Sequence, residues 1–172
     1  MQSIKCPPLE ELLSYENDRV LGRFSKIYGI QLSDSKDIFD NLLRWLWLNS
    51  YEMEAAHNKG IPIDTSTAVI DEMWHNFILF SRDYTEFCHK YFGCYIHHQP
   101  MTGKSSNNSK SEDYDSETIQ IKHDEFKEDK RKQLELIYET MGAEIFSVWY
   151  LEYPERYSVK KLAQMHLDTI TN

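Results

Sequence analysis

The chain has little glycine and proline, with six and five residues among 172. These residues mark the frequent turns of β-sandwiches and barrels, so their scarcity argues against an all-β fold. Apolar residues recur instead at helical spacing along most of the sequence. We therefore expect an all-α protein, a single irregular helical bundle of about six helices, with one domain spanning residues 1–172.

Cysteine is equally scarce. The three cysteines are an odd number without regular spacing, which argues against a disulfide framework. The first residues contain no apolar signal core, and no run approaches the ~18 apolar residues of a membrane span. We therefore expect a cytoplasmic protein with reduced thiols that does not enter a membrane.

Positive charge is in the minority, since 19 Lys and Arg face 28 Asp and Glu, for a formal net charge of −9. Nucleic acids and anionic membrane surfaces are bound through Lys and Arg, so this balance argues against both as partners. It leaves room for a basic protein partner, although a solvated acidic surface is the simpler interpretation. The oligomeric state is not determined by these features.

Several segments carry apolar residues on one helical face and have capping or breaking residues at their ends. One of them, residues 36–57, is apolar around most of its circumference, which predicts a central helix surrounded by others. The predicted helices span residues 9–28, 36–57, 67–80, 84–92, 124–141, 143–153 and 159–170.

The ends of these helices follow from single residues. Gly29 and Gly93 are expected to end helices in a left-handed conformation. Ser, Asp and Thr residues at positions 33–35 and 64–66 are candidate N-caps. Pro154 is expected to end the helix that precedes it.

Residues 101–120 differ from the rest of the chain because they are rich in Ser, Asn, Asp and Glu and almost free of aliphatic residues. Such a segment cannot bury enough apolar surface to fold by itself. We therefore expect a flexible surface loop inserted in the helical domain.

The chemistry is concentrated in residues 70–100, which hold four of the seven histidines and two of the three cysteines. Asp71 precedes His75 by four residues, so on a helix its carboxylate can reach the imidazole ring. A carboxylate that fixes one ring nitrogen leaves the other free to bind a metal or a proton.

A metal site is one interpretation of this stretch. The candidate ligands are His75, Cys88 and one of His97 or His98, with Asp71 as a further ligand or as the group that orients one. His75 and Cys88 are thirteen residues apart, which is not a whole number of turns, so they can converge only if the helix bends near residues 81–83. Zinc is the candidate metal, although the spacing matches no familiar zinc-finger pattern.

Two other interpretations stay open. Asp71 and His75 could form a buried hydrogen-bonded pair with Cys88 as a small core residue. In a catalytic interpretation, Cys88 is a nucleophile with His75 as its base, although its neighbour Phe87 suggests a buried and unreactive thiol. Alternatively, a metal with an open position activates water, with Asp71 or Glu72 as the base.

The same stretch contains a spaced series of residues: Asp71, then Trp74-His75, then Tyr84, Cys88, Phe92-Gly93 and His97-His98. This pattern resembles the glycine-rich domain-containing protein-like family, a domain of unknown function, and its ending is most similar to small bacterial members. The resemblance covers residues 60–100. It departs from larger members, which often have a second histidine at the position of Phe77 and a proline near Ser81. It implies that the carboxylate, the thiol and the histidines act together, but it implies no reaction.

Two functions are therefore expected from the sequence. The first is a non-enzymatic helical domain in which a structural His/Cys cluster, with zinc as the candidate metal, supports contacts with other proteins. The alternative is a metal-dependent enzyme of the hydrolase class with a site centred on His75.

Overall fold

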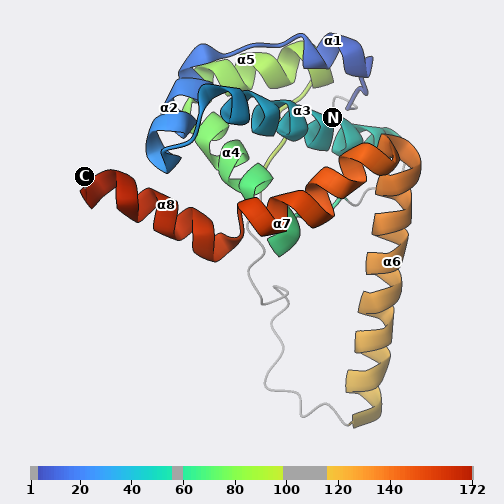
Figure 1. Cartoon of the computed structure of the whole chain (residues 1–172). Helices are drawn as coiled ribbons and strands as arrows, with labels where there is room; N and C mark the ends of the chain where they lie inside the picture. The colour runs from blue at the N-terminus through green and yellow to red at the C-terminus, as the bar shows by residue number, and fades with distance from the viewer. Residues whose placement is uncertain (1–3, 56–59, 99–115, 172) are drawn as a thin grey trace, which may run out of the picture.

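The structure is a computed structural model that describes residues 4–55, 60–98 and 116–171, without the side chains of residues 116–122. Within these ranges the chain forms helices joined by short connections and has no β-strand. The predicted all-α class is therefore confirmed (Figure 1).

The first predicted helix is in fact two helices, α1 (Leu9–Leu13) and α2 (Asp18–Tyr28). The break arises at Asn17, whose side-chain oxygen accepts a hydrogen bond from the backbone nitrogen of Val20 at 3.2 Å and so caps α2. α2 ends at Gly29, which has the left-handed φ of 62° that was expected of it.

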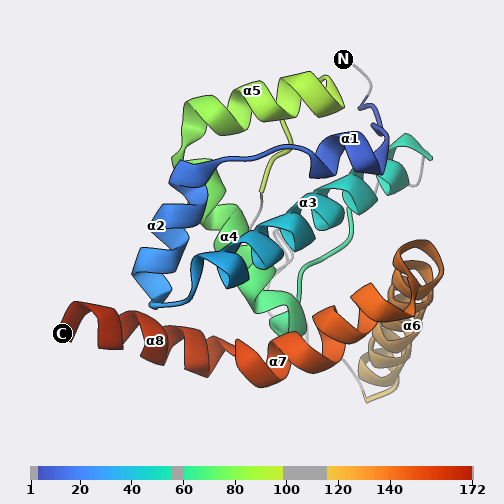
Figure 2. The ribbon, with the colours of Figure 1, turned by 45° about the horizontal axis from the view of Figure 1, so that its top comes forward.

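The long helix α3 (Leu32–Glu54) lies at the centre of the fold and packs against α1, α2 and α4 (Figure 2). Seven of its apolar side chains are at most 1% exposed: Ile38, Phe39, Leu42, Leu43, Trp45, Leu46 and Leu48. The predicted caps at residues 33–35 are wrong, because the helix already begins at Leu32. Asp34 instead accepts a hydrogen bond from Arg156 at 3.0 Å. The predicted last residues of this helix, 56 and 57, lie outside the described ranges.

Two helices follow that carry most of the chemistry, α4 (Ala68–Leu79) and α5 (Ser81–Phe92). A short 3₁₀ turn, η1 (Thr65–Thr67), precedes α4 and is capped by Asp64 as expected. The expected bend falls at Phe80, whose φ of −85° and ψ of 61° are not helical. α5 ends at Gly93 with a φ of 74°, again as predicted, and the chain then turns back toward α4 as residues 94–98.

The C-terminal part begins earlier than expected. α6 (Ser116–Ser147) begins before residue 124, where the helix was expected to start, and residues 101–115 of the predicted loop lie outside the described ranges. Much of α6 stands away from the other helices (Figure 1). Gly142 interrupts it with a φ of 83° and a ψ of 168°, as its sequence position predicted.

The chain then continues through a π-helical turn at Val148–Glu152 into α7 (Tyr153–Arg156), and finally into α8 (Val159–Thr171). Pro154 does not end a helix, contrary to expectation. It lies in the first turn of α7, directly after the π-helical turn, and the chain stays helical through it. α8 packs against α2 and α4.

The buried apolar residues of the described chain form one cluster, in which aromatic rings are prominent. Phe77 of α4 lies at its centre, with its ring 5.4 Å from that of Phe39 and 5.1 Å from that of Tyr84. This packing fixes the rotation of α4 about its axis. Among the described helices, none combines the length and apolar content that crossing a membrane requires.

Candidate metal centre

Helix α4 has a core flank and a half-open flank. On the core flank, Val69, Met73 and Phe77 are fully buried. Asp71 and His75 lie one above the other on the half-open flank, and their side chains are 28% and 45% exposed. Burial of the apolar stripe therefore turns the carboxylate and the imidazole away from the core.

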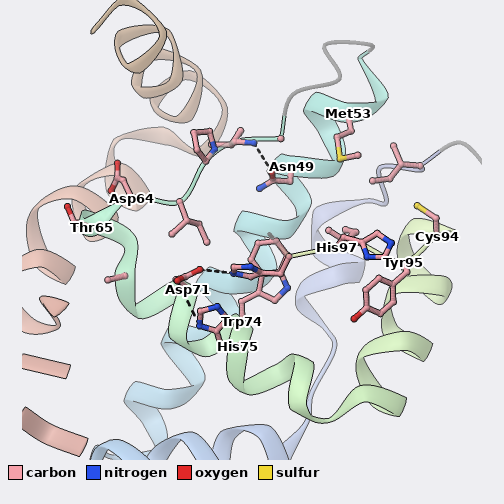
Figure 3. A pocket seen from close by; sticks show the side chains of 18 of the residues that line it. Asn49, Met53, Asp64, Thr65, Asp71, Trp74, His75, Cys94, Tyr95 and His97 are labelled. Carbon is pink, nitrogen blue, oxygen red and sulfur yellow. Dashed lines mark hydrogen bonds and ion pairs between the residues drawn. The ribbon is translucent and has the colours of Figure 1, made fainter. Parts of the chain in front are cut away.

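The segment after α5 brings His98 to this flank. Its Nε2 lies 2.7 Å from Oδ1 of Asp71, and the rings of His98 and His75 have centroids 4.5 Å apart. One ligand atom from each of Asp71, His75 and His98 lies within 4.8 Å of the others. In Figure 3 the dashed lines at Asp71 mark its two contacts, one of which runs to the labelled His75.

The hydrogen-bond partner of Asp71 is therefore His98, and the predicted hydrogen bond between Asp71 and His75 is wrong. The atoms Nδ1 of His75 and Oδ2 of Asp71 are 3.9 Å apart, which is an ion-pair contact but too long for a hydrogen bond. The ring of His98 also contacts the ring of Trp74, with centroids 4.3 Å apart. His98 is therefore held by two neighbours, the carboxylate of Asp71 and the indole of Trp74.

A buried chain of hydrogen bonds, which we call the tether, fixes the segment that carries His98. Nε1 of Trp74 donates to the hydroxyl of Tyr84 at 2.9 Å, and this hydroxyl donates to the carbonyl of Ile96 at 2.8 Å. All three residues are buried. The tether explains why Trp74 and Tyr84 accompany the site residues in the sequence: they hold the backbone two residues before His98.

Cys88 does not join the three grouped side chains, so the structure gives no support to its expected place among the ligands. It lies on the same face of α5 as Tyr84, four residues earlier, and that face is packed into the core. Burial raises the pKa of the Cys88 thiol, an effect that hydrogen bonds from the backbone of Ile96 and from Tyr84 partly oppose. A buried thiol with a raised pKa is a poor nucleophile, which also argues against the expected Cys88–His75 pair.

His97 is likewise outside the group, although it neighbours His98. Its side chain is exposed, and its ring lies 4.9 Å from that of Tyr95. Successive residues of an extended segment point to opposite sides, so only one of the two histidines can face Asp71. Two further residues of the same stretch also lie outside the group: His89 is exposed on α5 and Cys94 is half-buried.

The three ligands lie in the wall of a cleft of about 720 Å³. Its other walls come from the end of α3, residues 60–65, residues 94–98 and the start of α8. In Figure 3, Asp71 and His75 appear between Asp64 and Thr65 on one side and Tyr95 and Cys94 on the other. The apolar part of the lining includes Met53, Ile61, Ile63, Trp74, Ile96 and Val159.

Side chains of α3 and α6 hold the 60–65 wall in place. The amide oxygen of Asn49 accepts from the backbone nitrogen of Ile61 at 2.8 Å. From α6, Gln133 donates to the carbonyl of Pro62 at 3.0 Å, and Lys130 forms an ion pair with Asp64. These contacts join elements far apart in the sequence, so sequence patterns alone could not reveal the cleft.

One carboxylate and two imidazoles form a ligand set suited to zinc with three protein ligands, or to iron(II) bound by two histidines and a carboxylate. Ligand atoms at ~2.1 Å from a tetrahedral zinc lie ~3.4 Å from one another. Oδ1 of Asp71 and Nε2 of His98, now 2.7 Å apart, would need to separate by a fraction of an ångström to hold the ion. Half-buried side chains on a cleft wall can make this adjustment.

The family model described as UCP032817-like matches residues 24–140, which span α3, α4 and α5 and most of α6. This family is uncharacterized. The expected resemblance to the glycine-rich domain-containing protein-like family is wrong, because the family match is a different one and nothing else indicates that family. The resemblance rested on a short motif, whereas the family match extends well beyond it. No curated protein and no solved structure matches the chain.

Proposed function

The chain belongs to the UCP032817-like family, and from the geometry of its site we propose that it is a metal-dependent enzyme of the hydrolase class. Asp71, His75 and His98 hold one zinc ion in the cleft wall. The fourth coordination position faces the cleft and accepts water or substrate. This is the alternative that the sequence left open, now centred on three residues from two segments.

The observation that carries the proposal is the opening of a three-ligand group into a cleft of about 720 Å³. Structural zinc sites are closed by four protein ligands, whereas catalytic sites keep a position open. Cys88, the residue expected to help close a structural cluster, is packed into the core instead. The geometry therefore supports a catalytic centre better than the structural His/Cys cluster of the first expectation.

The chemistry follows from the ligand set. Zinc lowers the pKa of a bound water to about 7 and polarises a carbonyl oxygen, which together suit the hydrolysis of an ester or amide. Glu72, one of the two expected bases, accepts a hydrogen bond from the hydroxyl of Tyr28 at 2.8 Å and does not line the cleft. Asp71, the other, is one of the metal ligands, so the metal-bound hydroxide is itself the nucleophile.

The first test is metal binding, measured by elemental analysis and by competition with a chromophoric chelator. We expect the protein to bind about one zinc per chain and His98→Ala to bind it at least ~100-fold more weakly. His97→Ala is the matched control, because His97 is the adjacent histidine and lines the same cleft without joining the ligand group. An unchanged affinity in His98→Ala, or an equal loss in both variants, overturns the proposal.

The second test is catalysis by the zinc-loaded protein on a panel of nitrophenyl esters and anilides. We expect turnover that a chelator removes and zinc restores, and that His98→Ala lacks. Zinc binding without turnover of any substrate would overturn the enzymatic part of the proposal. The protein would then be a metal-binding domain acting through protein contacts, for which the net charge of −9 favours a basic partner.

A further inference from the structure

The lining of the cleft indicates the chemistry of its occupant. Apart from the metal ligands, its walls are mainly apolar, and Trp74 and Ile96 lie beside the ligand group in both sequence and space. The cleft volume of about 720 Å³ is within the ~300–1,000 Å³ of sites that bind small molecules. The occupant is therefore a small molecule with a substantial apolar part.

The charges of the lining limit the occupant further. No Lys or Arg is among the described residues that line the cleft, while Asp64 and Asp71 supply carboxylates. Asp64 is paired with Lys130 and accepts from the backbone nitrogen of Ser66 at 2.7 Å, so it is neutralised from outside the cleft. A phosphate or carboxylate on the part of the occupant that lies away from the metal would lose its hydration without gaining a cationic partner.

Two apolar side chains of the lining are notably open to solvent. Met53, near the end of α3, is 38% exposed, and Val159, at the start of α8, is 57% exposed. Single exposed apolar residues are common, but here two from distant parts of the sequence line the same cleft. A ligand that covers them removes apolar surface from water and gains affinity.

We infer that the cleft binds a small, uncharged ester or amide whose apolar arm lies against this wall and whose carbonyl group lies beside the open position on the metal. This inference rests on the proposed function and names the substrate class for the same site. The scissile carbonyl then lies beside the metal-bound water. The apolar walls cover the arm and keep bulk water away from it.

Alkyl hydroxamates test the inference, because their head group binds zinc and their tails differ only in length. The zinc-loaded protein is titrated calorimetrically with aceto-, butano- and hexanohydroxamate. We expect the affinity to rise by about threefold per methylene, which is on the order of 80-fold from the shortest to the longest. Equal affinities for all three hydroxamates overturn the inference.

Variants of the apolar wall provide the second arm of the test. Val159→Glu places a carboxylate at the N-terminus of α8, where a helix tolerates it well, and Met53→Lys places a cation in the last turn of α3. We expect each to weaken hexanohydroxamate at least fivefold while acetohydroxamate and zinc bind as before. Ile170→Glu is the matched control, since Ile170 is 66% exposed at the other end of α8. An unaltered chain-length dependence in both wall variants overturns the inference.

The third arm tests charge and separates this inference from the proposed function. Succinic acid monohydroxamate has a tail similar in length to butanohydroxamate but carries a carboxylate, and we expect it to bind at least tenfold more weakly. If the protein bound no zinc, the proposed function would fail, and hexanamide would then be titrated into metal-free protein by NMR. Shifts at the amides of Ile61, Thr65 and Ile96 would still support an apolar-arm site, whereas their absence would overturn it.

Discussion

Two groups of polar atoms meet at neighbouring residues of α4, Trp74 and His75, and differ in burial and in hydrogen bonding. In the tether, Trp74, Tyr84 and the Ile96 carbonyl are buried, and each polar atom has a partner. In the ligand group, the adjacent His75 is 45% exposed and makes no hydrogen bond within the described residues. From this difference we expect the tether to provide stability and the proposed ligand group to provide metal binding, so substitutions should separate the two properties.

The largest effect on stability is expected for Tyr84→Phe. This change removes one hydroxyl but leaves two buried groups without partners, the Trp74 N–H and the Ile96 carbonyl. We expect the free energy of unfolding to fall by about 2–4 kcal/mol, measured by urea denaturation of the metal-free protein. Zinc affinity should also fall, since the tether fixes the backbone two residues before His98.

Tyr95→Phe is the control for this experiment. Tyr95 packs edge-on against Tyr84 at 5.2 Å between centroids, but its hydroxyl makes no hydrogen bond within the described residues. We expect its removal to change the free energy of unfolding by less than about 0.5 kcal/mol. Equal effects in the two phenylalanine variants would show that the tether contributes no special stability.

A smaller loss, of about 1 kcal/mol, is expected for His98→Ala in the absence of metal. The change removes the ring that packs on Trp74 and the hydrogen bond to Asp71. The Asp71 side chain is 28% exposed, so water can replace the lost partner. If urea denaturation showed a loss as large as that of Tyr84→Phe, His98 would belong to the stabilising group and not to the ligand group.

The tether region should also make the protein sensitive to alkali. Burial raises the pKa of the Cys88 thiol above its ordinary 9.0 and that of the Tyr84 phenol above its ordinary 10.0. The unfolded chain therefore loses these protons at lower pH than the folded chain does. The resulting stability is fully present below the ordinary values and is lost as pH rises through them toward the folded values.

We accordingly expect the melting temperature to fall steadily above about pH 9. Cys88→Ala should show a shallower fall between about pH 8 and pH 10 than the natural protein, because it lacks one of the groups responsible. Parallel melting curves for the two proteins across this range would contradict the assignment.

How far the sequence predicted the site depends on how local each contact is. Asp71 and His75 are four residues apart on one helix, so their common face follows from helical geometry. Gly29, Gly93 and Gly142 interrupt the chain where expected, because only glycine adopts their positive φ at little cost. The choice of His98 over His97 depends on the tether, which joins α4, α5 and residues 94–98 and has no local signal.

Cys88 shows a different reason for an error. It was grouped with the histidines because of its chemistry, although it is four residues from Tyr84 on the stripe that α5 buries. Helical phase would have placed it in the core. The cleft walls at Met53, Ile61 and Val159 were missed because they come from three elements that meet only after α3, α4 and α8 have packed. The one early signal was the apolar linker Ile61-Pro62-Ile63, since linkers are usually polar.

The smallest effect on stability and the clearest effect on chemistry are expected from one change, His75→Ala. Its half-exposed ring has only a 3.9 Å ion-pair contact with Asp71 and a ring contact with His98, so metal-free stability should change by less than about 0.5 kcal/mol. Zinc at about 100 times its dissociation constant should stabilise the natural protein by about 2.7 kcal/mol. In His75→Ala the same zinc concentration should leave the melting temperature almost unchanged, because a site with two ligands binds far more weakly. Full zinc stabilisation of this variant would show that His75 is not a ligand, and the contrast between the ligand group and the tether would then fail.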